Sequence, residues 1–343
     1  MQIRFVDFKI AISLVVLSLA GFGSAHGADS AVRQQPAAAQ QSSGVPNDEL
    51  AAAVKQKGDK YLIDLSYQDA LNEYRHYMKL TAKPDPSVIV RIATCDGWLG
   101  RQGLSAREFE RAAKIYGDNL DGLLAQFDAH LVQAEYDQAL AIAEKCTKRF
   151  DKEWKGYMYL GFLHDKFLET ENAVAAYSRA IELYPLHPER ASNVRGLEGP
   201  LLQSRLYGLR GHCYYRLKKY REAVADCTKV LELEPGELTA YESRAEAYIH
   251  LDDFSAAERD LLQAVALKTI RARTYKQLGL CQLKRGDNEN AVTSFSAAIA
   301  HYPRYAEAFH LRAEAYRKLG KPVVAASDEV EARKLGFNLD GAV

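Results

Sequence analysis

The side chains of this sequence that could act together in chemistry are His212, Glu246 and His250. Imidazole nitrogens and a carboxylate can ligate zinc, but these spacings match no established zinc motif. The sequence also has no His-Glu-x-x-His, no Cys-x-x-Cys and no glycine-rich phosphate loop. We therefore predict no catalytic residue, no resident metal, no cofactor and no small-molecule substrate. A divalent-metal-binding role as an accessory factor of an enzyme stays an alternative.

The charged residues balance, with 45 Lys and Arg against 45 Asp and Glu among 343 residues. Proteins that bind nucleic acid carry a basic stripe, and none stands out here. We therefore expect no nucleic acid partner. A hydrophobic content of 48% is typical of a globular chain with a continuous core.

Small residues recur along the chain at intervals of about 34 residues. The eight members of this column are Ala70, Ser105, Ala139, Ala173, Ala223, Ala257, Ala291 and Ala325. A period of this length predicts eight copies of one structural unit, each packed on its neighbours. The step from Ala173 to Ala223 is longer by 16 residues, which predicts an insert between the fourth and fifth units.

Residues 204–237 show the architecture of one unit. Apolar residues three or four apart mark one face of a first helix over 207–217 and of a second helix over 220–231. Lys218 and Lys219 form the turn, and Pro235 with its neighbouring glycine ends the second helix. Each unit is therefore predicted to be a helix hairpin.

We number the places of each unit from 1 to 34, so that the small column stands at place 20. Helices cross closely only where their side chains are small, so place 20 is expected to face place 8 of the same unit. Place 27 is expected to face the following unit. The units are 51–84, 86–119, 120–153, 154–187, 204–237, 238–271, 272–305 and 306–339.

This pattern resembles the tetratricopeptide repeat family, whose period is 34 residues. The resemblance covers most of the chain after residue 50. It implies an all-α fold, a right-handed α-solenoid of about eight helix hairpins. It also implies that the first helices line a groove, into which places 2, 5, 9, 12 and 13 point. We therefore expect a non-catalytic scaffold that binds a protein or an extended peptide.

The groove places differ between the two halves of the chain. The first four repeats place apolar residues there: Trp98, Leu124, Met158 and Phe162. The last four place charged and polar residues there: His212, Glu242, Glu246, His250, Lys276 and Lys284. An exposed apolar stripe marks an interaction site, although an irregular array would instead bury these residues. The charged residues form either an inter-repeat ion-pair lattice or a surface matched to a charged partner.

The start of the chain, residues 1–27, resembles a secretory signal peptide, with Arg4 and Lys9 before the apolar run Ile10–Ala20. That run is shorter than the ~20 residues that a membrane-spanning helix needs. We expect cleavage and export to the periplasm or the extracellular space, with an uncleaved N-terminal membrane anchor as the alternative. Residues 28–48, rich in Ala, Gln, Ser and Pro, predict a disordered linker.

The remaining predicted segments are repeats 1–4 over 49–187, an insert or hinge at 188–203, repeats 5–8 over 204–339 and a tail at 340–343. A second function is also open, in which the array self-associates as a structural homo-oligomer. All five cysteines stand at core places, so we expect buried thiols, with a Cys213–Cys227 disulfide as the alternative.

The charged groove places generate a first testable prediction. Replacing both Glu242 and Glu246 with Lys is expected to weaken partner binding without unfolding the array, because exposed charges add little stability. Affinity capture from the native host, with the wild-type chain and the double variant as baits, measures this. Equal recovery of one partner by both baits would contradict the assignment.

Overall fold

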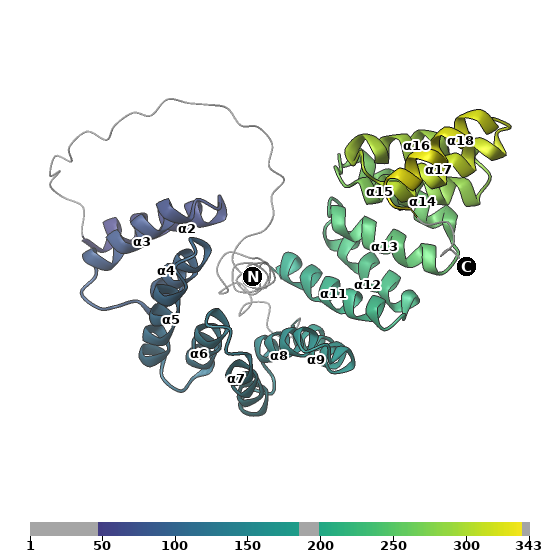
Figure 1. Ribbon diagram of the computed structural model, residues 1–343. Coiled ribbons are helices and arrows are strands. Elements are labelled where there is room, and N and C mark those ends of the chain that lie inside the picture. Colours follow the sequence, from purple (N-terminus) through teal and green to yellow (C-terminus); the bar gives the residue numbers. More distant parts are fainter. Residues whose placement is uncertain (1–46, 185–198, 338–343) are drawn as a thin grey trace, which may run out of the picture. The chain divides into compact units, whose positions relative to one another are not determined.

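In the computed structural model, residues 47–184 and 199–337 are described, and they form sixteen α-helices and no strand (Figure 1). The predicted signal peptide, nearly all of the linker, most of the insert and the tail lie outside the described residues. None of the helices in the described part is long and apolar enough to cross a membrane. The predicted all-α fold class is confirmed.

The helices form eight pairs, one for each predicted repeat, and a short turn joins the two helices of a pair. The pairs are α2 (Asn47–Ile63) with α3 (Tyr67–Leu80), α4 (Pro86–Trp98) with α5 (Gln102–Tyr116), α6 (Leu120–Val132) with α7 (Tyr136–Arg149), α8 (Trp154–Lys166) with α9 (Thr170–Leu183), α11 (Gly199–Arg216) with α12 (Tyr220–Leu233), α13 (Leu238–His250) with α14 (Phe254–Ala266), α15 (Ala272–Lys284) with α16 (Asn288–His301), and α17 (Ala306–Lys318) with α18 (Pro322–Lys334). Because α11 begins at Gly199, the first helix of repeat 5 extends back into the predicted insert.

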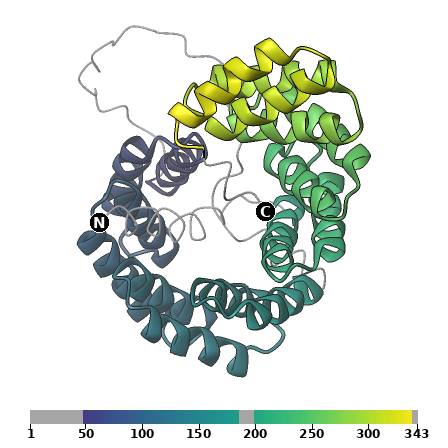
Figure 2. The ribbon, with the colours of Figure 1, turned by 45° about the vertical axis from the view of Figure 1, so that its right-hand side comes forward.

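The chain divides into two compact units. Unit 1 consists of residues 1–169 and 178–202, and unit 2 consists of residues 170–177 and 203–343. From α2 to α8 in unit 1, and from α12 to α18 in unit 2, each helix packs against the next one along the chain (Figure 2). Within each unit the core therefore runs as a continuous layer between successive helices.

The column of small residues at place 20 is buried in every repeat. Its members are at most 2% exposed: Ala70, Ser105, Ala139, Ala173, Ala223, Ala257, Ala291 and Ala325. In repeat 2 the hydroxyl of Ser105 donates a hydrogen bond of 2.7 Å to the main-chain oxygen of Ala93, at place 8. Cys146, at place 27 of repeat 3, contacts the first helix of repeat 4. A Cβ added to Gly156 of that helix would lie 3.0 Å from the Cβ of Cys146. Both predicted contacts are confirmed at these positions.

A second close contact of place 8, with the aromatic residue at place 24, was not foreseen from the sequence. Gly58 lies against Tyr74, and Gly279 lies against Phe295. A Cβ at either glycine would come within 2.7 Å of the facing ring, and both rings are fully buried. The glycines therefore let each ring pack directly against the backbone of the first helix.

Every turn within a repeat has the same backbone conformation. The residue at place 15 has a positive φ in all eight: Leu65, Gly100, Ala134, Leu168, Lys218, Asp252, Gly286 and Gly320. Its N–H donates to the oxygen of place 12 and the next N–H to the oxygen of place 11, which is a Schellman motif. A non-glycine residue in this conformation costs roughly 1–2 kcal/mol. Packing of the helix pair therefore imposes the turn in the five repeats without glycine.

The five cysteines are all buried thiols, as predicted: Cys95, Cys146, Cys213, Cys227 and Cys281. The structure does not hold the alternative disulfide within repeat 5. Loss of hydration raises the pKa of the Cys95, Cys227 and Cys281 thiols to about 12. These side chains act as small apolar core residues, because they are thiols rather than thiolates at neutral pH.

Two glycine substitutions test how tightly the hairpins close. Gly279→Ala is expected to destabilise the protein by about 1–3 kcal/mol, because the new methyl group collides with the Phe295 ring. Gly208→Ala, also within a first helix, is expected to stabilise it by about 0.5–1 kcal/mol, since the methyl group would meet only Val230 at 3.9 Å. Urea unfolding of both variants measures the difference, and a shift of the same sign in both would contradict this packing.

Candidate functional site

Buried ion pairs tie the first helix to the second helix in three repeats of unit 2. Arg210, Arg244 and Arg312, all at place 7, each bind an aspartate at place 23 through two hydrogen bonds of 2.7–2.9 Å. The aspartates, whose side chains are at most 9% exposed, are Asp226, Asp260 and Asp328. We call these three pairs the Arg–Asp ladder. Removing one partner of such a buried pair costs about 3–5 kcal/mol.

The ladder also connects neighbouring repeats. Arg244 of repeat 6 donates to the hydroxyl of Thr228 in repeat 5 at 3.0 Å. Arg312 of repeat 8 donates in the same way to Ser296 in repeat 7 at 2.9 Å. The guanidinium groups therefore fix each of these hairpins both internally and against the one before it.

Repeat 7 keeps the architecture without the ion pair. Leu278 takes the arginine place and Ser294 the aspartate place, and both are buried. The Ser294 hydroxyl donates to the side-chain oxygen of Gln282 at 2.7 Å instead. Because both members of the pair are replaced together, neither charge is left unpaired in the core.

The first helices of unit 2 share one polar face. We call it the first-helix surface, and it consists of His212, Tyr215, Glu242, Glu246, His250, Arg273, Lys276, Lys284, Glu307 and Glu314. Helix α13 contacts α15, and α15 contacts α17, so equivalent places of these repeats lie beside one another. The structure therefore places the six predicted site residues of this half on neighbouring helices.

Glu242 of α13 holds the loop between α14 and α15. Its carboxylate accepts hydrogen bonds from the hydroxyls of Thr269 and Thr274, at 3.0 and 2.5 Å, and pairs with Arg271. Both threonines are buried, and only 12% of the Glu242 side chain is exposed. Glu242 is therefore a structural residue, and the expectation that its reversal leaves the array unperturbed conflicts with these contacts.

Glu246 belongs to a cluster that joins three repeats. The Tyr215 hydroxyl donates to Glu246 at 2.6 Å and lies 3.0 Å from Nε2 of His250, while Arg273 forms an ion pair with Glu246. Burial and the bond to Glu246 raise the pKa of Tyr215, so the hydroxyl keeps its proton. Since that one proton goes to the carboxylate, Nε2 of His250 must donate to Tyr215. The His250 ring also stacks on Tyr220, with centroids 4.5 Å apart.

The remaining predicted residues of this surface differ in their partners. Lys276 is held by both carboxylate oxygens of Glu307, at 3.1 and 3.2 Å. His212 and Lys284 are exposed and make no hydrogen bond or ion pair with the described residues. The first-helix surface therefore combines a fixed ion-pair lattice with side chains that are available to a partner.

Unit 1 does not present the predicted apolar stripe. Met158 and Phe162 are buried, at 2% and 6% exposed, so these two side chains are core residues in the structure. Leu124 is half-buried, and Trp98 is half-buried with its ring stacked on Tyr67 at 5.2 Å. The sequence alone could not separate these cases, because groove and core places adjoin on an apolar first helix.

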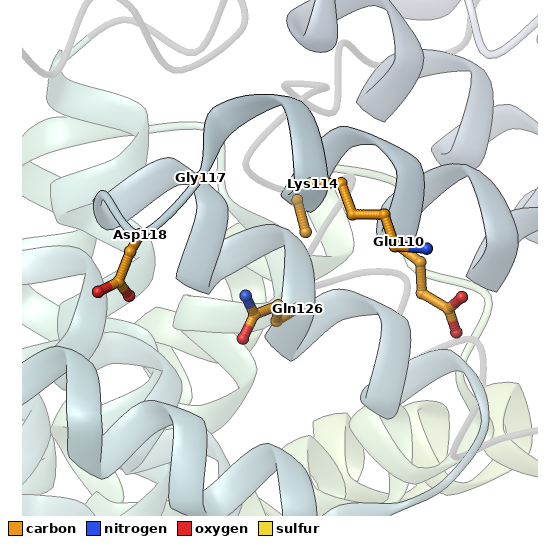
Figure 3. A pocket seen from close by; sticks show the side chains of 6 residues that line it. Glu110, Lys114, Gly117, Asp118 and Gln126 are labelled. Atoms are coloured by element: carbon orange, nitrogen blue, oxygen red, sulfur yellow. The ribbon is translucent and has the colours of Figure 1, made fainter.

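A shallow pocket of about 350 Å³ lies in unit 1 against α5 and α6 (Figure 3). It is lined by Glu110, Ala113, Lys114, Gly117, Asp118 and Gln126. In Figure 3 the Asp118 carboxylate points away from Glu110 and Lys114, and it is bound by Lys145 and Arg149 of α7. No predicted site residue lines this pocket.

The metal hypothesis gains no support from the geometry. Among the residues that the structure describes, no three His, Cys, Asp or Glu side chains form a group that could hold a metal ion. Glu246 and His250 instead share the hydroxyl of Tyr215. Their positions are thus explained by hydrogen bonding within the protein.

Comparisons with known proteins agree with this architecture. A tetratricopeptide repeat family model matches residues 204–237, and a second model with the same description matches 124–189 and 277–334. Tetratricopeptide repeat protein 16 of Homo sapiens is 25% identical over 206 residues, which cover 58% of this chain and 23% of that protein. The BBSome complex member BBS4 homolog of Drosophila melanogaster is 23% identical over 266 residues, which cover 68% of this chain and 54% of that protein. The chain therefore spans only part of the length of these relatives.

Among solved structures, the chain is similar to YrrB, which is described as a tetratricopeptide repeat protein with an unusual peptide-binding site. The TM-score is 0.47 and the sequence identity is 21%, and the match covers 57% of this chain and 92% of YrrB. Stacked hairpins with a 34-residue period define an all-α solenoid protein. The chain belongs to the tetratricopeptide repeat family and carries multiple repeats.

Three parts of the site were not predicted from the sequence: the Arg–Asp ladder, Tyr215 and the threonines that bind Glu242. The Arg–Asp ladder left a readable signal, because Arg and Asp stand sixteen residues apart at the same two places in three repeats. Tyr215 also occupies a groove place and could have been included. The threonines that bind Glu242 could not be predicted from the repeat pattern. The loop sequence Lys268–Arg271 occurs in repeat 6 alone, so no other repeat shows the same contact.

The unequal roles of Glu242 and Glu246 can be separated by stability measurements. Glu242→Ala is expected to lower the free energy of unfolding by about 1–3 kcal/mol, because buried threonine hydroxyls lose their acceptor. Glu246→Ala is expected to cost less than about 1 kcal/mol, since Arg273 is largely exposed. Thermal and urea unfolding give both values, and equal losses would contradict the distinction.

Proposed function

We propose that the protein is a non-catalytic scaffold that binds an extended peptide segment of another protein across the first-helix surface of unit 2. One observation carries the proposal: polar side chains from successive repeats stand in register on neighbouring first helices, and His212 and Lys284 among them are exposed and available. A repeated array of this kind offers similar contacts to an extended chain at regular steps.

Rigidity of the surface supports the same function. The Arg–Asp ladder fixes the hairpins, and Glu246, Tyr215 and His250 are already held by hydrogen bonds before any partner arrives. A preorganised surface loses little conformational entropy on binding, which favours affinity. The printed description of YrrB names a peptide-binding site in that protein, which is compatible with this proposal.

The setting of this binding is part of the proposal. The basic start and short apolar run of residues 1–27 favour an exported protein, in the periplasm or outside the cell, that takes part in assembling an envelope or secreted complex. N-terminal sequencing of the protein isolated from its host tests this, and an intact Met1 would argue for an uncleaved anchor.

Selection from a random peptide library tests the binding function. The purified full chain is screened against displayed peptides of twelve residues, and enriched peptides are titrated by fluorescence anisotropy. His212→Trp is expected to weaken their binding about tenfold, or 1.4 kcal/mol, because the indole would occupy an exposed place on the surface. Ser255→Trp, exposed on the second helix α14, is the matched control and should bind normally.

Two results would overturn the proposed function. One is the absence of any enriched peptide that binds the chain more tightly than an unrelated all-α protein. The other is a set of enriched peptides that both tryptophan variants bind as well as the wild type, which would place the binding surface elsewhere.

A further inference from the structure

Two loops of unit 2 adjoin at one end of the helix hairpins. The α14–α15 loop precedes α15 and the α16–α17 loop follows α16, so both lie at the end of this hairpin opposite its turn. The Tyr275 hydroxyl donates to the main-chain oxygen of Thr269 at 3.1 Å, and the Tyr275 ring stacks on His301 with centroids 4.8 Å apart. Tyr275 therefore joins the first loop to the residue that precedes the second loop.

The two loops expose apolar side chains. Ile270 is 80% exposed, Tyr302 is 52% exposed and Leu267 is 41% exposed. Ile270 stands between Thr269 and Arg271, which both bind Glu242, so the outward position of its side chain is fixed by the loop. Single exposed apolar residues are common on proteins, but three of them on two adjoining loops mark an interaction site.

The same loops are basic. Lys268 and Arg271 lie in the first loop and Arg304 in the second, and residues 267–271 and 302–305 contain no Asp or Glu. Arg271 pairs with Glu242. The side chains of Lys268 and Arg304 are exposed and make no hydrogen bond or ion pair with the described residues. We define the loop surface as Leu267, Lys268, Ile270, Arg271, Tyr302 and Arg304, and its charge is positive even when Glu242 is counted.

The surroundings limit this surface to the two loops. The other loop between repeats of unit 2, α12–α13, contains Glu234 and Glu237 and no large apolar residue over 234–237. Glu307 follows the second loop, and its carboxylate is bound by Lys276. Exposed apolar side chains and unpaired positive charges therefore coincide on the loop surface.

We propose that the loop surface docks unit 2 on an anionic lipid surface. Ile270, Leu267 and Tyr302 would enter the headgroup region, while Lys268 and Arg304 would bind lipid phosphates. Tyrosine is enriched at the membrane–water boundary, apolar side chains bury just below it, and Lys and Arg are attracted to anionic lipids. These side chains stand on loop tips and not around a groove, so they fit a broad, deformable surface.

The contact is peripheral and reversible. A few apolar side chains bind a bilayer more weakly than a spanning helix does. Each cation near an anionic surface adds about fivefold to the affinity, and salt screens this attraction. The loop surface shares no residue with the first-helix surface, so the inference does not rest on the proposed function.

Vesicle flotation of the full chain tests the docking. We expect vesicles of phosphatidylcholine and phosphatidylglycerol to bind at least about tenfold more tightly than vesicles of phosphatidylcholine alone, and less tightly as salt is raised. Lys268→Glu with Arg304→Glu is expected to weaken this binding at least about twentyfold. Ile270→Ser is expected to weaken it about fivefold, because less apolar area enters the lipid.

A matched pair of charge reversals serves as the control. Lys218→Glu with Lys219→Glu makes the same change in net charge in the turn between α11 and α12, where both side chains are exposed. This turn lies at the opposite end of the hairpins, so the control variant should bind vesicles as the wild type does. Circular dichroism of each variant checks that the fold is retained.

A local probe separates the loops from residues 1–27, which contain an apolar run of their own. An environment-sensitive nitrobenzoxadiazole group on Ile270→Cys is expected to brighten and shift to the blue on anionic vesicles. The same group on Ser255→Cys, exposed at the other end of α14, should not respond. The five native thiols are buried, which directs the label to the new cysteine.

Several results would overturn the inference. One is equal binding to both kinds of vesicle, or equal weakening by the two double variants. Flotation without a response at position 270 would assign binding to another part of the chain. A response to rising protein concentration without vesicles would make the loops an interface between copies. An equal response to soluble polyglutamate would indicate an acidic protein partner instead of a lipid surface.

Discussion

The two helices of each repeat approach so closely that only hydrogen, a methyl group or a hydroxymethyl group fits at place 20. This constraint explains why a small residue is buried at the same place of all eight repeats, and why glycine at place 8 meets an aromatic ring in repeats 1 and 7. It also explains the common turn, because a hairpin closed this tightly forces residues such as Leu168 and Lys218 into a left-handed conformation.

The close approach of the two helices made the fold predictable from the sequence. It also explains which features of the site could not be predicted. Places 20 and 27 were assigned correctly because each admits few residue types, as Ser105 and Cys146 show. Met158 and Phe162 were expected on a surface, yet they are buried, since an apolar residue satisfies a groove place and a core place equally well. Contacts such as Thr269 with Glu242 depend on a loop that occurs once, and a periodic pattern carries no information about it.

Charge has two distinct roles in unit 2. Inside the hairpins, bidentate pairs such as Arg244 with Asp260 fix geometry, and repeat 7 shows that a leucine and a serine can replace such a pair when both sides change together. On the first-helix surface, pairs near solvent such as Glu246 with Arg273 add little to stability, whereas Glu242 is held by two buried threonines and is structural. The effect of the ion pairs there is to join side chains of neighbouring repeats, as Glu246 with Arg273 and Lys276 with Glu307 show.

The buried thiols have a consequence for how the protein matures. Because each of the five sulfur atoms fills a gap in the core and none is needed as a covalent cross-link, the chain can reach its native state without a disulfide-forming enzyme or a thiol oxidant. A reducing cytoplasm and an oxidising exterior would give the same molecule. The folded array therefore does not depend on the redox potential of its compartment, and its folding is compatible with either side of a membrane.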